Sequence, residues 1–241
     1  MSSKWQTEAL STSFLENVRS AIPLRSTQIE VILKLIKLWN PDVKKVMDLG
    51  CGDGILGRCL LEKYPSIELF SLDFSDTMLD AARNNLGHAD SVKFFKADFS
   101  TLLWQETTST LGKLDLVISG FAIHHLSDQR KKEVYQEIND LLNPGGLFLN
   151  LEHVSSTTQE VETVFDDCFV DSLHSYHLKT NAQAKRETIA DNYYNRPDKI
   201  ENILAPVDVQ CEWLREIGYQ DVDCYFKFFE LALFGGRKAM T

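Results

Sequence analysis

The chain has few cysteines for its 241 residues, and their spacing matches no structural motif. No two are separated by only two residues, so there is no Cys-x-x-Cys pair, and an odd number cannot pair completely in disulfides. These absences exclude a disulfide framework and favour a reducing, cytoplasmic setting. The five cysteines are Cys51, Cys59, Cys168, Cys211 and Cys224.

Basic residues are also scarce relative to acidic ones. The sequence holds 25 lysines and arginines against 35 aspartates and glutamates, which gives a net charge of −10 and a pI near 5.1. Broad binding to nucleic acid depends on a basic footprint. We therefore expect no extended nucleic-acid partner.

Long apolar runs are absent as well. No stretch approaches the roughly 20 apolar residues that a membrane-spanning helix needs, and the first residues lack a basic start followed by an apolar segment. We expect no membrane partner. With 44% hydrophobic residues, a chain of this length can bury the core of one large α/β domain.

What the sequence does contain is a glycine-rich turn after a short apolar run, at Lys45–Gly57 (KVMDLGCGDGILG). Glycines at 50, 52 and 54 permit backbone angles closed to other residues and leave room for a ligand to touch the main chain. The helix predicted over Ile55–Tyr64 would place the amides of this loop at a helix start, which favours a polar or anionic ligand group.

Two ligand classes fit these glycines. Gly52, Gly54 and Gly57 have the spacing of a dinucleotide fingerprint, which overlaps the Gly-x-Gly-x-Gly pattern. Asp48, directly before the loop, would repel a pyrophosphate and is well placed for a cationic amino group. Asp73 follows Gly54 by 19 residues, close to the spacing at which an acid on the second strand of a nucleotide-binding fold binds a ribose. An adenosine-type ligand is therefore expected.

Apolar runs alternate with amphipathic segments through the middle of the chain. This alternation predicts a parallel, doubly wound sheet with right-handed crossovers. After the strand that begins at Lys45, the expected strands are Ile67–Leu72, Val92–Lys96, Leu114–Ser119 and Leu147–Leu151. The expected helices are Gln28–Trp39 capped by Ser26 or Thr27, Asp76–Leu86 capped by Ser75, and Asp128–Leu142.

The remainder departs from this alternation. Residues 152–208 are rich in histidine, tyrosine, aspartate and threonine and are interpreted as an inserted helical cap or substrate lid. A helix over Asp208–Ile217, ended by Gly218, then leads to a hairpin of Val222–Phe228 and Leu231–Phe234. We expect one domain over residues 1–241, with N-terminal helices (1–40), a cofactor-binding core (41–151), the cap (152–208) and a closing helix and hairpin (209–241).

The candidate ligand residues follow the predicted strands. Because the carboxyl ends of parallel strands meet at one edge, the glycine loop, Asp73, Asp98 and Ser119–His125 are expected on one rim.

With these motifs in order, the sequence resembles the class I S-adenosylmethionine-dependent methyltransferases from about Val43 to the C-terminus. The segments that carry the resemblance are DLGCGDG (48–54), SLDFSDTML (71–79), KADF (96–99), LDLVISGFAIHHL (114–126) and LLNPGGLFLNLEH (141–153). The resemblance implies an α/β, doubly wound, Rossmann-like sheet of seven strands with an antiparallel last strand, and S-adenosylmethionine as cofactor.

The resemblance also implies roles for the rim residues. Asp48 and Gly50 would lie along the methionine portion, with the Ser119 carbonyl on its amino group. Gly52 and Gly54 would admit the sugar. The other implied contacts are Asp73 on the ribose hydroxyls, Phe74 and Met78 beside the adenine, Asp98 on its amino group, and the Phe99 amide at the ring edge. Arg25, near Pro23, is a candidate for the methionine carboxylate.

The C-terminal portion from Asn195 to Lys238 is similar to carboxy-S-adenosylmethionine synthases, a family of this fold in tRNA wobble-uridine modification. Arg196 is the nearest candidate for the carboxylate-binding arginine of that family. Synthase activity is therefore kept beside methyl transfer to an O, N or S nucleophile of a small molecule. A third alternative is a regulatory module that binds the cofactor without catalysis.

The acceptor site is expected from histidines and cap residues. His125 and His153 follow the fourth and fifth predicted strands, and a histidine can accept a proton near neutral pH, so both are candidate catalytic residues. Asp171, His174 and His177 have a spacing that permits metal ligation, but without a fourth ligand we expect no metal. A monomer or a homodimer is expected. The candidate substrate contacts are His124, Tyr176, His177, Tyr194 and Arg196.

Overall fold

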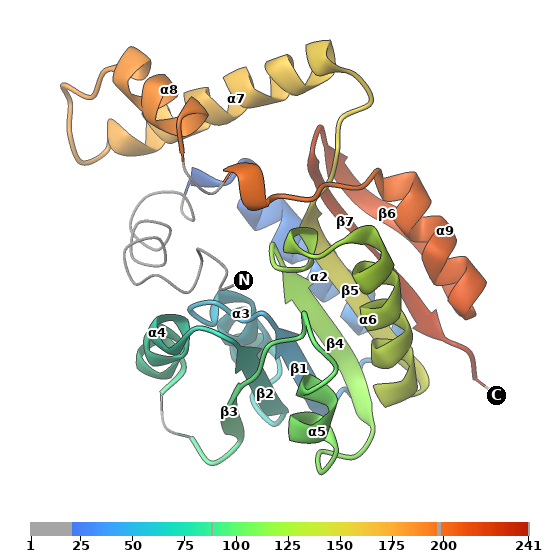
Figure 1. The fold of residues 1–241 in the computed structure, drawn as a ribbon. Coiled ribbons are helices and arrows are strands. Elements are labelled where there is room, and N and C mark those ends of the chain that lie inside the picture. Colours follow the sequence, from blue (N-terminus) through green and yellow to red (C-terminus); the bar gives the residue numbers. More distant parts are fainter. Residues whose placement is uncertain (1–20, 88, 197–198, 241) are drawn as a thin grey trace.

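The computed structural model describes residues 21–87, 89–196 and 199–240, and it contains a sheet of seven strands in the order β3-β2-β1-β4-β5-β7-β6 (Figure 1). Strands β1 to β5 are parallel, whereas β7 runs antiparallel to both β5 and β6. This arrangement confirms the predicted doubly wound sheet with an antiparallel last strand. The strands are β1 (Lys45–Leu49), β2 (Glu68–Asp73), β3 (Val92–Lys96), β4 (Leu114–Gly120), β5 (Leu142–His153), β6 (Tyr219–Phe228) and β7 (Leu231–Lys238).

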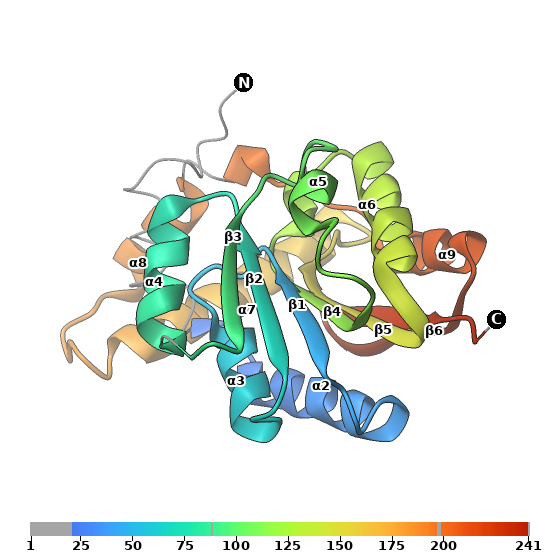
Figure 2. The same ribbon diagram turned by 90° about the horizontal axis from the view of Figure 1, so that it is seen from below.

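Helices cover both faces of the sheet, as Figure 2 shows. On one face, α2 (Arg25–Trp39) and α3 (Ile55–Lys63) bury Ile36 and Leu60 against Val46, and α4 (Asp76–Leu86) packs beside α3. The other face is covered by α5 (Trp104–Thr108), α6 (Asp128–Leu141) and α9 (Val207–Ile217). Because both faces are buried, the central strands are apolar on both sides rather than alternating.

Several boundaries differ from the sequence prediction, and those of α2 and β5 have a clear structural cause. Helix α2 begins at Arg25 after Leu24 in a left-handed conformation, so neither Ser26 nor Thr27 is its cap. Strand β5 begins at Leu142 rather than at the predicted Leu147, so Asn143–Gly146 lie within it as an irregularity opposite β4. Local turn composition favoured a break there, but pairing with β4 resumes at Leu147.

The predicted cap is helical in the structure. Helix α7 (Gln159–His177) and helix α8 (Arg186–Tyr194) lie beyond the carboxyl ends of β4 and β5 (Figure 1). Phe165 and Phe169 of α7 pack with Tyr193 of α8 and with Ile22. A short helix, η5 (Lys199–Glu201), returns the chain toward α9. Most of the N-terminal segment predicted to be helical lies in residues 1–20, outside the described residues.

No helix in the described part of the chain combines the length and the apolar character that crossing a bilayer requires.

Candidate functional site

The glycine loop between β1 and α3 has the left-handed backbone that the sequence predicts. Gly50, Gly52 and Gly54 have φ angles of 69°, 54° and 81°. A Cβ at Gly50 would lie 2.4 Å from that of Ala122, which follows β4, whereas a Cβ at Gly52 would meet nothing within 4 Å. The loop therefore packs tightly against the β4 end at Gly50 and leaves open space at Gly52.

Asp48 is buried at the end of β1 and faces the start of α3. Its Oδ2 accepts a hydrogen bond from the Gly57 amide at 3.1 Å. Burial raises the pKa of Asp48 to about 7, with a further increase from nearby Asp73, while the Gly57 bond opposes the shift. A cation beside this carboxyl would favour its charged form.

Asp73, at the end of β2, connects two ligand-facing segments. Its Oδ2 accepts from the Gly52 amide and its Oδ1 from the Ser75 amide, both at 2.9 Å. Burial raises its pKa although these bonds favour the carboxylate. Because a carboxylate oxygen has more than one lone pair, each oxygen can still accept from a ligand hydroxyl.

A third group of candidate cofactor residues lies in the segments that follow β2 and β3. Phe74 is half-buried, and Met78 is buried in the first turn of α4, which Ser75 caps as predicted. Asp98 is exposed, and its Oδ1 accepts from the Ser100 amide at 2.8 Å. The Phe99 ring lies 3.5 Å from the position of a Gly50 Cβ, so the loop after β3 also contacts the glycine loop.

The Ser119 hydroxyl has a hydrogen-bond partner, whereas two donor nitrogens of Arg25 have none. The Ser119 hydroxyl, fully buried in β4, donates to the Leu49 carbonyl at 2.8 Å. The Nε and one terminal nitrogen of Arg25 are buried without a hydrogen-bond partner, and burial lowers the pKa of this side chain. An unpaired buried guanidinium is costly, and it is suited to an anionic ligand group.

These features fit S-adenosylmethionine. Carboxylates at 48, 73 and 98 suit a ligand that carries a sulfonium and an ammonium, the space at Gly52 admits close approach to the backbone, and Arg25 presents unpaired donors. The structure places the predicted cofactor residues that end or follow β1 to β4 at one rim of the sheet, whereas Arg25 begins α2 and lies near Cys59 of α3.

A second group lies next to this rim and consists of three histidines and two buried glutamates. Ile123–His125 form a short helix, η4, directly after Ala122, which contacts the glycine loop. The rings of His124 and His125 are 3.9 Å apart, and those of His124 and His153 are 5.7 Å apart. The fold thus brings the histidines after β4 and β5 together.

Glu152 is the buried partner of these histidines. Its Oε1 accepts from His124 Nδ1 at 2.6 Å and from the His153 amide at 2.9 Å, while its Oε2 is buried without a partner. Burial raises the pKa of Glu152 to about 7. Sequence reasoning missed this residue, although it carried the signal used elsewhere, an acid at the carboxyl end of a strand.

Glu230 holds His153. Its Oε2 lies 2.8 Å from His153 Nε2, and its Oε1 accepts from the Ser156 amide at 3.1 Å. Burial would raise the pKa of Glu230, but the bonds from His153 and Ser156 prevail and lower it. Glu230 had no sequence signal, because it lies 77 residues from His153 in the closing hairpin.

Burial lowers the pKa of the two histidines in η4, His124 and His125. Burial lowers the pKa of His125 to about 3, with a further decrease from His124, and it lowers the pKa of His124 well below its ordinary value. Both rings are therefore neutral at pH 7. A ring that holds a captured proton this weakly is a poor general base, which argues against a general-base role for His125.

Of the cap residues predicted to contact substrate, Tyr176 and His177 lie away from the histidines. The His153 ring lies 5.7 Å from that of Phe165, and Tyr176 and His177 lie at least 11 residues, or about 16 Å, further along α7. Tyr194 is 44% exposed, and Arg196 stacks 4.0 Å above the Tyr193 ring.

No cluster of three or more residues of metal-ligating type, in an arrangement that could hold an ion, occurs in the described ranges. Of the spaced residues considered for a metal, Asp171 pairs with Arg186, and His174 Nε2 lies 3.0 Å from the Ala184 carbonyl.

Comparison with known proteins identifies a methyltransferase domain in the chain. Residues 46–146 match the family model described as a methyltransferase domain. The carboxy-S-adenosyl-L-methionine synthase of Campylobacter lari is 23% identical over 228 residues, which cover 92% of this chain and 88% of the synthase. Malonyl-[acyl-carrier protein] O-methyltransferase 2 of Ilyobacter polytropus is 28% identical over 110 residues, which cover 46% of this chain and 39% of that enzyme.

A solved structure supports the fold. Human N-acetylserotonin methyltransferase in complex with S-adenosylmethionine superposes with a TM-score of 0.61 at 16% identity. The match covers 98% of this chain and 57% of the human protein, so the chain spans less than two thirds of that structure. The chain therefore has the fold of the class I S-adenosylmethionine-dependent methyltransferases and contains a methyltransferase domain over residues 46–146.

Proposed function

We propose that the chain transfers a methyl group from S-adenosylmethionine to an oxygen, nitrogen or sulfur nucleophile of a small molecule. The observation that carries this proposal is the contact between Gly50 and Ala122. This contact joins the cofactor loop to η4, so the buried histidines begin immediately beside the expected cofactor position.

The cofactor is proposed to lie along the rim. Asp48, the Gly50 backbone and the Ser119 carbonyl would contact its methionine portion, and Arg25 would pair with the methionine carboxylate. Asp73 would accept from the ribose hydroxyls through the oxygens that already hold the Gly52 and Ser75 amides. Phe74 and Met78 would flank the adenine, with Asp98 and Phe99 at its edge.

Methyl transfer is a direct displacement at an activated methyl group, so alignment of the nucleophile and exclusion of water supply most of the catalysis. His153 is the proposed proton acceptor for a hydroxyl substrate. Its bond to Glu230 assigns the ring proton to Nε2 and leaves Nδ1 as an acceptor. The other nearby histidines, His124 and His125, would shape the acceptor site as neutral rings.

Replacing His153 by alanine tests this role. Turnover should fall on the order of 100-fold, the range of general-base catalysis, while the affinity for S-adenosylmethionine stays within about twofold. His174→Ala, which alters a histidine of the cap, is the matched control. Turnover that is undiminished in His153→Ala would contradict the assignment.

A second candidate is carboxy-S-adenosylmethionine synthesis, which is favoured by similarity over 92% of this chain to the Campylobacter lari synthase. In that case Arg196, which is placed in the cap beside Tyr193, would have to reach a ligand carboxylate. Mass spectrometry of the nucleoside that copurifies with the protein separates the two. A carboxylated cofactor would support the synthase, whereas S-adenosylmethionine or its demethylated product would support methyl transfer.

A further inference from the structure

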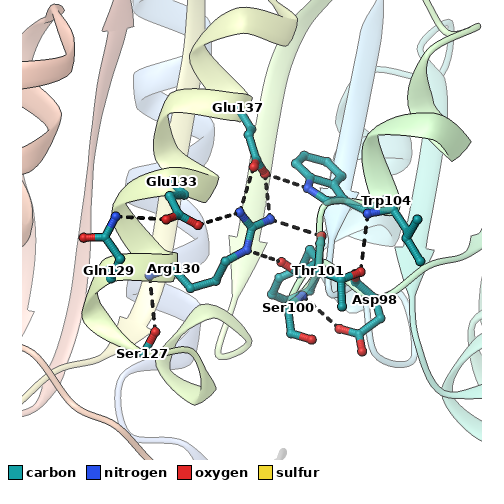
Figure 3. Close-up of polar contacts among 11 residues, drawn as sticks. Asp98, Ser100, Thr101, Trp104, Ser127, Gln129, Arg130, Glu133 and Glu137 are labelled. Atoms are coloured by element: carbon teal, nitrogen blue, oxygen red, sulfur yellow. Dashed lines mark hydrogen bonds and ion pairs between the residues drawn. The ribbon is translucent and has the colours of Figure 1, made fainter.

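Arg130 is a buried arginine of α6 that reaches across to the loop after β3. Only 9% of the residue is exposed, although it begins in the first turn of a surface helix. The Ser127 hydroxyl accepts from its backbone amide at 3.3 Å, so the helix start is capped at the same place. Its guanidinium leaves the helix and points into the body of the protein (Figure 3).

The guanidinium binds two backbone carbonyls of that loop. Its Nε donates to the Phe99 carbonyl at 3.1 Å, and Nη2 donates to the Thr101 carbonyl at 3.2 Å. These carbonyls flank Ser100, whose amide binds Asp98. A single side chain of α6 therefore holds the loop that carries Asp98 and Phe99 through two hydrogen bonds.

Glu137 holds the guanidinium in this position. Its two oxygens pair with Nη1 and Nη2 of Arg130 at 2.7 Å and 2.8 Å, and Oε2 also accepts from the Trp104 indole at 2.7 Å (Figure 3). A bidentate charged pair is geometrically specific as well as strong. Because Trp104 is fully buried, the pair has little freedom to move.

The fastened loop also touches the glycine loop. The Phe99 ring lies 3.5 Å and 3.6 Å from the position of a Gly50 Cβ, and the carbonyl of the same residue is the one that Arg130 binds. A shift of the Phe99 backbone would therefore move both the adenine edge and the wall beside Gly50.

We propose that Arg130 is a positioning residue that sets the adenine-recognition loop, residues 98–101, and thereby the selectivity of the pocket for the base. The inference rests on the cofactor placement under Proposed function, in which Asp98 accepts from the adenine amino group. Arg130 does not touch the ligand. It acts through the Phe99 and Thr101 carbonyls, which fix where the Asp98 carboxylate and the Phe99 amide stand.

Arginine is required by this geometry. Three donor groups of one planar guanidinium serve two loop carbonyls and both oxygens of Glu137. Lysine keeps the charge, but its N–H groups all lie on one nitrogen, which cannot reach all of these acceptors. The loop would then be held by fewer bonds while the buried charge stays paired.

Calorimetry with two ligands tests the proposal. S-adenosylhomocysteine carries the adenine amino group, and S-inosylhomocysteine carries an oxo group at the same position. The wild-type protein should prefer the first, and Arg130→Lys should reduce this preference roughly tenfold, about the value of one charge-assisted hydrogen bond. Arg186→Lys, in the exposed pair with Asp167 and Asp171, is the matched control and should leave the preference unchanged.

Asp98→Asn separates the inference from the placement on which it rests. An amide donor at this position should favour the oxo group and reverse the preference. If Asp98→Asn alters the preference and Arg130→Lys does not, the positioning role is overturned while the placement stands. If neither changes it, both are overturned. Lower melting temperature with unchanged preference in Arg130→Lys means a structural role only and overturns the inference.

A second variant keeps the proposal testable if Arg130→Lys does not fold. Glu137→Gln keeps the shape of the side chain but weakens its hold on Arg130, and it should also lower the preference. The Trp104 indole, which donates to Glu137, should change its fluorescence in this variant. An unchanged preference in Glu137→Gln with altered fluorescence would contradict the proposal.

Discussion

At the scale of single residues, Asp73 joins ligand binding to loop shape. Its two oxygens accept hydrogen bonds from the Gly52 and Ser75 amides. One carboxylate therefore holds the glycine loop, holds the Ser75 amide just before α4, and is proposed to bind the sugar.

Asp73→Ala should weaken S-adenosylmethionine binding on the order of 100-fold or more, because two charge-assisted hydrogen bonds are lost together. Isothermal calorimetry measures this change. Asp80→Ala, which removes an exposed acid paired with Arg83 on α4, is the control and should bind normally. An affinity in Asp73→Ala equal to that of the wild type would refute the ribose assignment.

At the scale of elements, the glycine loop contains two positions that the same substitution should affect differently. Alanine at Gly50 meets Ala122 at 2.4 Å and also has a φ of 69°, so the fold itself should be destabilised. Alanine at Gly52 meets no atom within 4 Å, and only its φ of 54° is unfavourable, a strain of about 1–2 kcal/mol.

We therefore predict that Gly50→Ala lowers the melting temperature by much more than Gly52→Ala does. The Gly52 variant should remain folded but lose cofactor affinity, because its new methyl group occupies the space that the ligand needs. Thermal melts with and without S-adenosylmethionine measure both effects. A Gly52 variant that is stabilised by the cofactor as well as the wild type would contradict this view of the loop.

Element boundaries show how far local sequence reasoning reaches. Helix α4 spans Asp76–Leu86 with Ser75 as its cap, as predicted, because its start signal and its apolar face agree. Helix α2 begins three residues earlier than predicted, since Leu24 rather than a serine or threonine precedes it. The composition of Asn143–Gly146 is typical of a turn, yet these residues lie within β5 because the strand pairs with β4 on both sides of them.

At the scale of the whole molecule, buried carboxyls make stability depend on pH. Burial raises the pKa of Glu152 to about 7, so folding favours its neutral form. The contribution is fully present below the ordinary carboxyl pKa and is lost as the pH rises through about 7. Asp48, whose pKa is also raised to about 7, acts in the same direction.

Glu152→Gln should therefore be more stable than the wild type at alkaline pH, by about 3 kcal/mol, and should show a flatter loss of stability from about pH 5 to about pH 8. Urea unfolding of the ligand-free proteins across this range measures the difference. Since Asp48 is present in both proteins, its contribution cancels. Parallel pH profiles for the two proteins would show that Glu152 is not the responsible group.

The sequence by itself determined the parallel core, the glycine loop and the acids at 48, 73 and 98, because these features depend on local periodicity and on the rule that strand ends meet at one edge. Only the tertiary structure decided what surrounds the histidines. Glu152 reaches His124 through pairing of β5 with β4, and Glu230 reaches His153 through pairing of β7 with β5. Arg130 and Glu137 meet the loop after β3 through packing of α6 on α5. Apart from Glu152, which lies at the carboxyl end of a strand, these partners are brought together by strand pairing and helix packing, so no local pattern could identify them.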